Sequence, residues 1–197
     1  MSQNLLIVES PSKAKTLKKY LGRGFDILAS YGHVRDLQAK EGAVDPADNF
    51  HMKYVPVEKN KKHVDAIAKA VGKADRIYLA TDPDREGEAI AWHLGEILKG
   101  KKLLKNKKLY RVVFYEITES AVTDAVAKPR QISMPLVNAQ QARRALDHLV
   151  GFKLSPPARH QAGRPQHSHL HDAARVHGHL QQQRPNDQNR QLQALQP

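Results

Sequence analysis

The chain of 197 residues contains no cysteine, which excludes disulfide bonds and thiolate metal ligands. It also has no apolar run long enough to span a bilayer, so we expect no membrane contact. Its N-terminus lacks the basic segment and apolar core of a secretory signal. We therefore expect a cytoplasmic protein.

Acidic residues are in the minority. The chain has 32 Lys and Arg against 20 Asp and Glu, giving a formal net charge of +12 and a sequence pI of about 9.9. Such an excess favours solubility, and it also favours a polyanionic partner such as a nucleic acid. The lysines cluster at 59–62 and 99–108. Clusters of this kind are typical of solvated faces, so they do not by themselves predict a DNA site.

Strand and helix patterns alternate over residues 4 to about 130. Short apolar runs predict strands at 5–8, 25–29, 76–80 and 110–115. Helical spacing of apolar residues predicts helices at 11–21, 61–71, 86–98, after Thr118, and at 135–151, whereas 38–58 has no regular pattern. This alternation predicts an α/β fold with a mostly parallel sheet covered by helices.

Three acids lie within five residues directly after the strand at 76–80. They are Asp82, Asp84 and Glu86, and Glu9 follows the first predicted strand in the same way. The carboxyl ends of neighbouring parallel strands meet at one edge of a sheet, which is where such folds place their active sites. Carboxylates held this close are most easily kept ionised by a hard cation such as Mg²⁺. The alternative is a helix N-terminus at which the macrodipole favours acids.

Lys13 lies one turn into the first helix, where it could face a phosphate. From its position alone, among Lys15, Lys18 and Lys19, a solvated lysine is the better interpretation.

Five blocks occur in the order found in one known family. They are Leu5-Leu-Ile-Val-Glu-Ser-Pro-Ser-Lys-Ala-Lys15, Ser30-Tyr-Gly-His-Val-Arg-Asp-Leu37, Ala80-Thr-Asp-Pro-Asp-Arg-Glu-Gly-Glu-Ala-Ile-Ala-Trp-His93, Arg111-Val-Val-Phe-Tyr-Glu-Ile-Thr118 and Asn138-Ala-Gln-Gln-Ala-Arg-Arg-Ala-Leu-Asp-His-Leu-Val-Gly151. The chain resembles the N-terminal part of a bacterial type IA DNA topoisomerase over roughly residues 1–156. A single block would be weak, whereas five in order are highly specific.

The resemblance implies a fold and a domain division. The fold would be a Toprim-type, Rossmann-like sandwich, followed by a helix and a disordered tail. Residues 1–130 would form the Toprim domain, and 131–155 would begin the helical core domain of the family. Residues 156–197 hold nine Gln and six His but none of the nineteen Lys. We expect disorder there, and the abrupt change in composition suggests a frameshifted or truncated reading frame.

The resemblance also implies roles for individual residues. Glu9 would move a proton at the ribose 3′ oxygen, and Lys13 would stabilise charge on the phosphate. Glu9, Asp82, Asp84 and Glu86 would form the Mg²⁺ site. The DNA-binding residues would be His33, Arg143, Arg144, Asp147 and His148. Without the resemblance, Arg143 and Arg144 would be interpreted as a solvated helix face.

The family cleaves and religates single strands of DNA without ATP, through a tyrosine in a Tyr-x-Arg-Thr context, and so relaxes supercoils. None of the six tyrosines of this chain has that context, so we expect the chain alone to be inactive. The implied protein is cytoplasmic and nucleoid-associated. The alternatives are a free-standing Toprim nuclease or phosphotransferase, an Asp-x-Asp phosphatase, and a non-catalytic DNA-binding module.

Overall fold

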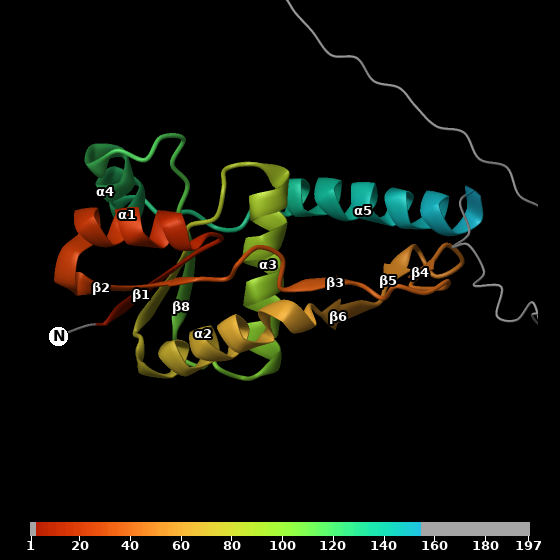
Figure 1. The fold of residues 1–197 in the computed structure, drawn as a ribbon, viewed down its shortest axis with the longest axis horizontal. Helices are drawn as coiled ribbons and strands as arrows, with labels where there is room; N and C mark the ends of the chain where they lie inside the picture. Colours follow the sequence, from red (N-terminus) through yellow and green to blue (C-terminus); the bar gives the residue numbers. More distant parts are fainter. Residues whose placement is uncertain (1–2, 155–197) are drawn as a thin grey trace, which may run out of the picture. The chain divides into compact units, whose positions relative to one another are not determined.

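A four-stranded parallel sheet organises the fold (Figure 1). The computed structural model describes residues 3–154, so the expectations for residues 156–197 lie outside the described residues. The strand order is β2 (Phe25–Ala29), β1 (Asn4–Val8), β7 (Arg76–Leu79) and β8 (Lys108–Arg111), and every neighbouring pair is parallel. The predicted α/β class with a mostly parallel sheet is confirmed.

Helices cover both faces of this sheet. On one face, Leu6 and Val8 of β1 pack in a cluster with residues of α1 (Pro11–Leu21) and α4 (Glu119–Ala127). On the other face, Leu5 and Ile7 pack in a cluster with residues of α2 (Lys61–Lys73) and α3 (Arg85–Gly100). Because successive side chains of a strand point to opposite faces, a strand covered on both faces consists of continuous apolar residues. This explains the uninterrupted run from Leu5 to Val8.

Side-chain caps start three of the helices, and two of them, Ser10 and Thr118, are where the sequence indicated them. The hydroxyl of Ser10 accepts from the Lys13 amide at 3.3 Å, with Pro11 at the first position of α1. Asp84 caps α3, and Thr118 caps α4 by accepting from the Ala121 amide at 3.3 Å. These caps satisfy amides that have no partner inside the helix. They therefore fix where each chain segment turns from strand to helix.

Two sequence expectations need correction. The fourth strand was predicted at 110–115, but β8 ends at Arg111, because β7, the strand that it pairs with among residues 3–154, ends at Leu79. The segment 38–58 was expected to be irregular, but it contains β4 (Val44–Asp45), β5 (His51–Met52) and β6 (Tyr54–Pro56), and the last pairs with β3 (Arg35–Leu37). Strands of two or three residues are too short to show a period. Two short 3₁₀ helices, η1 (Gly22–Gly24) and η2 (Glu58–Asn60), complete the elements.

The last described element is α5 (Met134–Leu154), which packs against α3 and β4. Figure 1 shows β3 and β6 continuing from the sheet toward the region beneath α5. The division of the chain at residue 130 stays a prediction. No helix in the described part of the chain is long and apolar enough to cross a membrane.

Candidate active site at the carboxyl edge of the sheet

The ends of β1 and β7 bring Glu9, Lys13 and Asp82 together. The two strands are neighbours, with Ile7 paired to Leu79, so the loops that follow them leave the same edge of the sheet. The ammonium group of Lys13 donates to Asp82 Oδ1 at 2.5 Å and also contacts Glu9 Oε1. A single lysine on the first turn of α1 therefore joins the two carboxylates that follow the two strands.

The charges of these three groups support one another. Burial by itself lowers the pKa of Lys13, but hydrogen bonds to Asp82 and Glu9 outweigh it and raise the pKa above its usual value. Lys13 therefore stays a cation at neutral pH. The second carboxylate oxygen of Glu9, Oε2, is buried and has no hydrogen-bond partner in the described part of the chain. Glu9 thus retains one buried acceptor that faces no protein donor.

Asp84 and Glu86 make different contacts from Asp82. Asp84 Oδ1 accepts from the Gly87 amide at 2.7 Å, so this carboxylate is used as the cap of α3. Glu86 Oε1 lies 2.8 Å from His33 Nε2, and both side chains are about half exposed. Glu9 and Asp82 are thus joined to each other, while Asp84 and Glu86 point to partners of their own.

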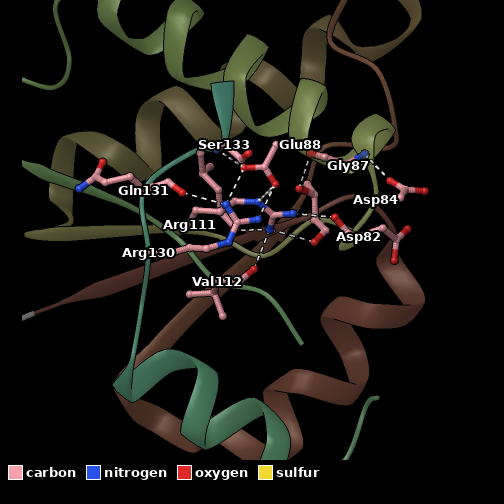
Figure 2. Close-up of polar contacts among 11 residues, drawn as sticks. Asp82, Asp84, Gly87, Glu88, Arg111, Val112, Arg130, Gln131 and Ser133 are labelled. Atoms are coloured by element: carbon pink, nitrogen blue, oxygen red, sulfur yellow. Dashed lines mark hydrogen bonds and ion pairs between the residues drawn. The ribbon is translucent and has the colours of Figure 1, made fainter. Parts of the chain in front are cut away.

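A buried ion-pair network behind this edge was not anticipated from the sequence (Figure 2). The side chains of Glu88 on α3 and Arg111 on β8 are both 0% exposed, and Arg111 Nε donates to Glu88 Oε2 at 3.0 Å. Arg130 also donates to both oxygens of Glu88, at 3.0 and 2.8 Å, and the Ser133 amide donates to one of them at 2.6 Å. Burial alone raises the pKa of Glu88, but its donors, Arg130 first, lower it below the usual value.

This network positions the acidic loop. Arg111 donates to the carbonyls of Leu79 at 3.0 Å, Thr81 at 2.9 Å and Asp82 at 2.6 Å. Three carbonyl groups, one at the end of β7 and two in the loop that follows it, are therefore held by one guanidinium group that is itself held by Glu88. A signal was present in the sequence, because Arg111 opens the apolar run Val112-Val113-Phe114, and a charge at the edge of a buried strand needs a partner.

Gly87 permits the close approach of α3 to the acidic loop. A Cβ atom at this position would lie 2.2 Å from the Asp82 carbonyl oxygen, and both atoms could not occupy their places. Thr81 Oγ1 donates to the Gly87 carbonyl at 2.6 Å across the same contact. The glycine in Asp-Arg-Glu-Gly is therefore required by packing at the turn.

The predicted DNA-binding residues of α5 divide into two sets. Arg143 is exposed and pairs with Asp147 one turn later, at 3.0 Å. Arg144 donates to both oxygens of Asp36, at 2.8 and 2.9 Å, which raises the pKa of Arg144 and, against the effect of burial, lowers that of Asp36. His148 is buried, and its Nε2 donates to the Lys40 carbonyl at 3.2 Å. Arg143, whose side chain is 58% exposed, thus pairs within α5, whereas Arg144 and His148 hold α5 to the 36–40 segment.

His33 is held by a residue that the sequence did not single out. The buried side-chain amide of Asn60 donates to the carbonyls of Tyr31, at 2.9 Å, and His33, at 2.8 Å. Tyr31 has a positive φ of 62°, which side chains larger than glycine rarely adopt. Asn60 therefore stabilises a strained turn that aims His33 at Glu86.

The donor chemistry of this edge fits Mg²⁺. Among residues 3–154 no three His, Cys, Asp or Glu side chains gather closely enough to hold a metal ion by themselves. Mg²⁺, however, is usually bound through one or two carboxylates, because it keeps several of its waters. The Glu9 and Asp82 carboxylates, together with the unpartnered Glu9 Oε2, supply hard oxygen ligands of that kind.

Comparison with known proteins identifies the family of this chain. Residues 4–117 match the sequence model of the Toprim domain. The chain is 65% identical over 156 residues to DNA topoisomerase 1 of Xylella fastidiosa, and 58% identical over 153 residues to that of Rickettsia bellii. These stretches cover 79% and 77% of this chain, but only 19% of each relative.

A solved structure gives the same result. Full-length topoisomerase I of Thermotoga maritima superposes with a TM-score of 0.68 at 41% identity, over 77% of this chain and 25% of that one. The chain spans about a fifth of the length of the curated relatives it matches. It therefore belongs to the Toprim domain family and corresponds to the N-terminal Toprim region of bacterial DNA topoisomerase I.

Proposed function

We propose that this chain carries the acid–base and Mg²⁺-binding half of a type IA DNA topoisomerase active site. The observation that carries the proposal is the Glu9–Lys13–Asp82 contact at the carboxyl ends of two neighbouring parallel strands. It unites the residues that the family blocks single out, although Lys13 and Asp82 lie 69 positions apart in the chain.

Each residue has a chemical role in this proposal. Glu9, with one free buried oxygen, transfers a proton to or from the ribose 3′ oxygen. Lys13, held as a cation, stabilises negative charge on the phosphodiester. Asp82 would hold Mg²⁺ with Glu9, while Asp84 and Glu86 would act through the loop and its waters. The metal, when bound, would neutralise charge that develops at the phosphate.

The proposed substrate is DNA, bound through single-stranded segments. The net charge of +12 favours a polyanion, and the exposed guanidinium of Arg143 is suited to a phosphate. Through its contact with Glu86, His33 lies beside the acidic loop, where a strand bound for cleavage would pass. In this proposal the protein acts in the cytoplasm, at the nucleoid.

The 197 residues do not contain the proposed nucleophile. Tyrosines 20, 31, 54, 78, 110 and 115 all lack the Tyr-x-Arg-Thr context. A covalent phosphotyrosine conserves the energy of the broken bond, and a carboxylate, a lysine and a metal cannot replace it. We therefore propose that the chain alone binds DNA without relaxing it, with or without ATP.

The test is incubation of the purified chain with Mg²⁺ and labelled single-stranded DNA. We expect salt-dependent retention without cleavage, and replacement of Arg143 with Gln should lower the salt slope by about one phosphate contact. Arg23→Gln, at an exposed position on η1, is the matched control and should bind at the wild-type slope. Nicking by water would support a Toprim nuclease, and release of phosphate from a small monoester would support a phosphatase.

A further inference from the structure

Exposed cations from separate segments of the chain meet at the amino edge of the sheet, where its strands begin. β7 begins at Arg76 and β8 begins at Lys108, Lys73 ends α2, and Lys102 and Lys105 lie between α3 and β8. All five side chains are exposed, and together they are called the amino-edge patch. The candidate active site lies at the opposite, carboxyl edge, so the patch is a separate surface.

Lys107 ties the segments of the patch together without belonging to it. Its Nζ donates to three carbonyl groups at the end of α2, those of Val71 at 2.7 Å, Gly72 at 3.2 Å and Ala74 at 2.6 Å. The last carbonyls of a helix have no partner inside it and attract cations. This contact fixes the segment before β8 against the end of α2, and so brings the patch residues of both segments to one place.

Like charges lie side by side within the patch. Arg76 of β7 is paired in register with Lys108 of β8, and neighbouring strands lie only about 4.8 Å apart. Charges of one sign at such a separation repel each other. The dipole of α2 favours Lys73 in the last turn of that helix, but it does not account for the other four cations. A bound polyanion would remove the repulsion.

Acidic side chains do not balance the charge of the patch. The chain has no Asp or Glu over residues 97–115. Asp75 accepts from the Gln3 amide at 3.0 Å. Asp65 pairs at 3.1 Å with Lys101, which is not a patch residue. Among residues 3–152 no patch residue takes part in an ion pair, so the patch is a surface of one sign.

The side chains around the patch favour the backbone of duplex DNA over other polyanions. In the described part of the chain, the exposed large apolar side chains all lie outside 61–76 and 97–111. Protein interfaces are centred on apolar and aromatic anchors, and single strands bind by stacking their bases on aromatic rings. A duplex instead presents its phosphates, which lysine and arginine neutralise without such anchors. We propose that the amino-edge patch binds the phosphate backbone of a duplex DNA segment.

This surface is a second DNA contact, and it rests on the proposed function only in taking DNA as the polyanion. The four residues of β7 alone separate the two edges of the sheet by roughly 10–13 Å, so one phosphate cannot reach both. The chain thus holds a single strand at the carboxyl edge and a duplex segment at the amino edge. Binding of single strands tests the proposed function separately, because Arg143 lies on α5, outside the patch.

The test compares a labelled blunt duplex with a single strand of the same length, by fluorescence anisotropy over a series of salt concentrations. The patch variant of the full chain, Arg76→Gln/Lys105→Gln/Lys108→Gln, removes three charges and leaves the structural Lys107 in place. For the duplex, the slope of log K against log salt should fall by about 2–3, because each phosphate contact contributes about 0.9. For the single strand, the slope should change by less than one such contact.

The matched control, Lys15→Gln/Lys53→Gln/Lys128→Gln, removes three charges from exposed lysines elsewhere in the chain and should keep the wild-type slope for the duplex. A second variant keeps the charge of the patch while changing its side chains, through Arg76→Lys together with Lys105→Arg and Lys108→Arg. It should bind the duplex at the wild-type slope as well.

Three results would overturn the proposal. They are a wild-type chain that does not retain the duplex, a patch variant with the same slope as the control, and equal losses for the duplex and the single strand. A polyglutamate peptide that binds the wild type but not the patch variant, while the duplex binds both equally, would also overturn it. That result would assign the patch to an acidic protein segment instead.

Discussion

Lys13 is the side chain that joins Glu9 to Asp82, and its charge occupies the place between two carboxylates. A cation of the protein and a bound Mg²⁺ compete for the same oxygens. We expect Lys13→Met to bind Mg²⁺ about tenfold more tightly than the wild type, equivalent to ~1.4 kcal/mol. Isothermal titration calorimetry of the two proteins measures this directly.

Lys15→Met is the control for this change, because Lys15 is exposed on the same helix and its loss alters the net charge equally. It should bind Mg²⁺ as the wild type does. Equal affinities of Lys13→Met and the wild type would contradict direct competition. Mg²⁺ binding to neither protein would contradict the proposed metal site itself.

The buried His93 makes the free energy of unfolding depend on pH. It does so at pH values above those at which carboxylates titrate. Burial lowers its pKa to about 3, against about 6.5 in an unfolded chain. The unfolded state therefore binds one more proton as the pH falls from about 6.5, and stability falls by about 1.4 kcal/mol per pH unit from this group. His93→Gln should flatten this dependence between about pH 6.5 and 4.5, as measured by urea denaturation.

The exposed His51 provides the matched control. His51→Gln should keep the wild-type slope over the same pH range. If His93→Gln loses stability with falling pH as steeply as the wild type does, protonation of His93 is not coupled to unfolding.

At the scale of the elements, Gly87 determines how closely α3 approaches the acidic loop. A Cβ there would lie 2.2 Å from the Asp82 carbonyl oxygen, whereas nothing lies within 4 Å of one at Gly72 in α2. Gly87→Ala should destabilise the fold by about 1–3 kcal/mol and displace Asp82. Gly72→Ala should stabilise it by about 0.5–1 kcal/mol, because alanine loses less entropy in a helix.

Urea denaturation of the two glycine variants gives both values, and Mg²⁺ titration reports whether Asp82 has moved. A Gly87→Ala variant that is as stable as the wild type would show that the α3–loop contact is not strained by a side chain.

Elements with strong local signals were predictable from the sequence. The run Leu5–Val8, Ser10 with Pro11, and Thr118 each indicated a strand or a helix start, and the structure confirms all three. The short strands within 38–58 are not predictable from the sequence, because β4 and β5 have only two residues each and β6 pairs with β3, where Val55 lies opposite Asp36. The end of β8 was misplaced for the same reason, since β7 determines how far it pairs.

The candidate site was predictable only in part. Glu9 and Asp82 follow apolar runs, so their meeting at one sheet edge could be inferred from their places at the carboxyl ends of two parallel strands. For the Glu88–Arg111–Arg130 network, the sequence offers only the charge of Arg111 beside an apolar run as a signal, because Glu88 has the pattern of one more polar residue on an amphipathic helix. The roles of Arg143 and Arg144 also differ in a way that the sequence hides, since Asp36 lies 108 positions from Arg144.

At the scale of the whole molecule, the chain holds one half of a proposed active site and spans about a fifth of its relatives. Its acid, lysine and loop are positioned by the sheet and by the buried Arg111, so the site is built before any further domain is added. We therefore expect this region to support relaxation of DNA when the remainder of a relative is supplied.

The most direct test replaces the corresponding region of Xylella fastidiosa DNA topoisomerase 1 with residues 1–154 of this chain, and measures relaxation of supercoiled DNA with Mg²⁺. The account predicts an active chimaera, a loss of about 100-fold or more in Glu9→Gln, and full activity in Glu41→Gln, which alters an exposed acid. A folded, DNA-binding chimaera that does not relax DNA, or one that keeps its activity in Glu9→Gln, would contradict it.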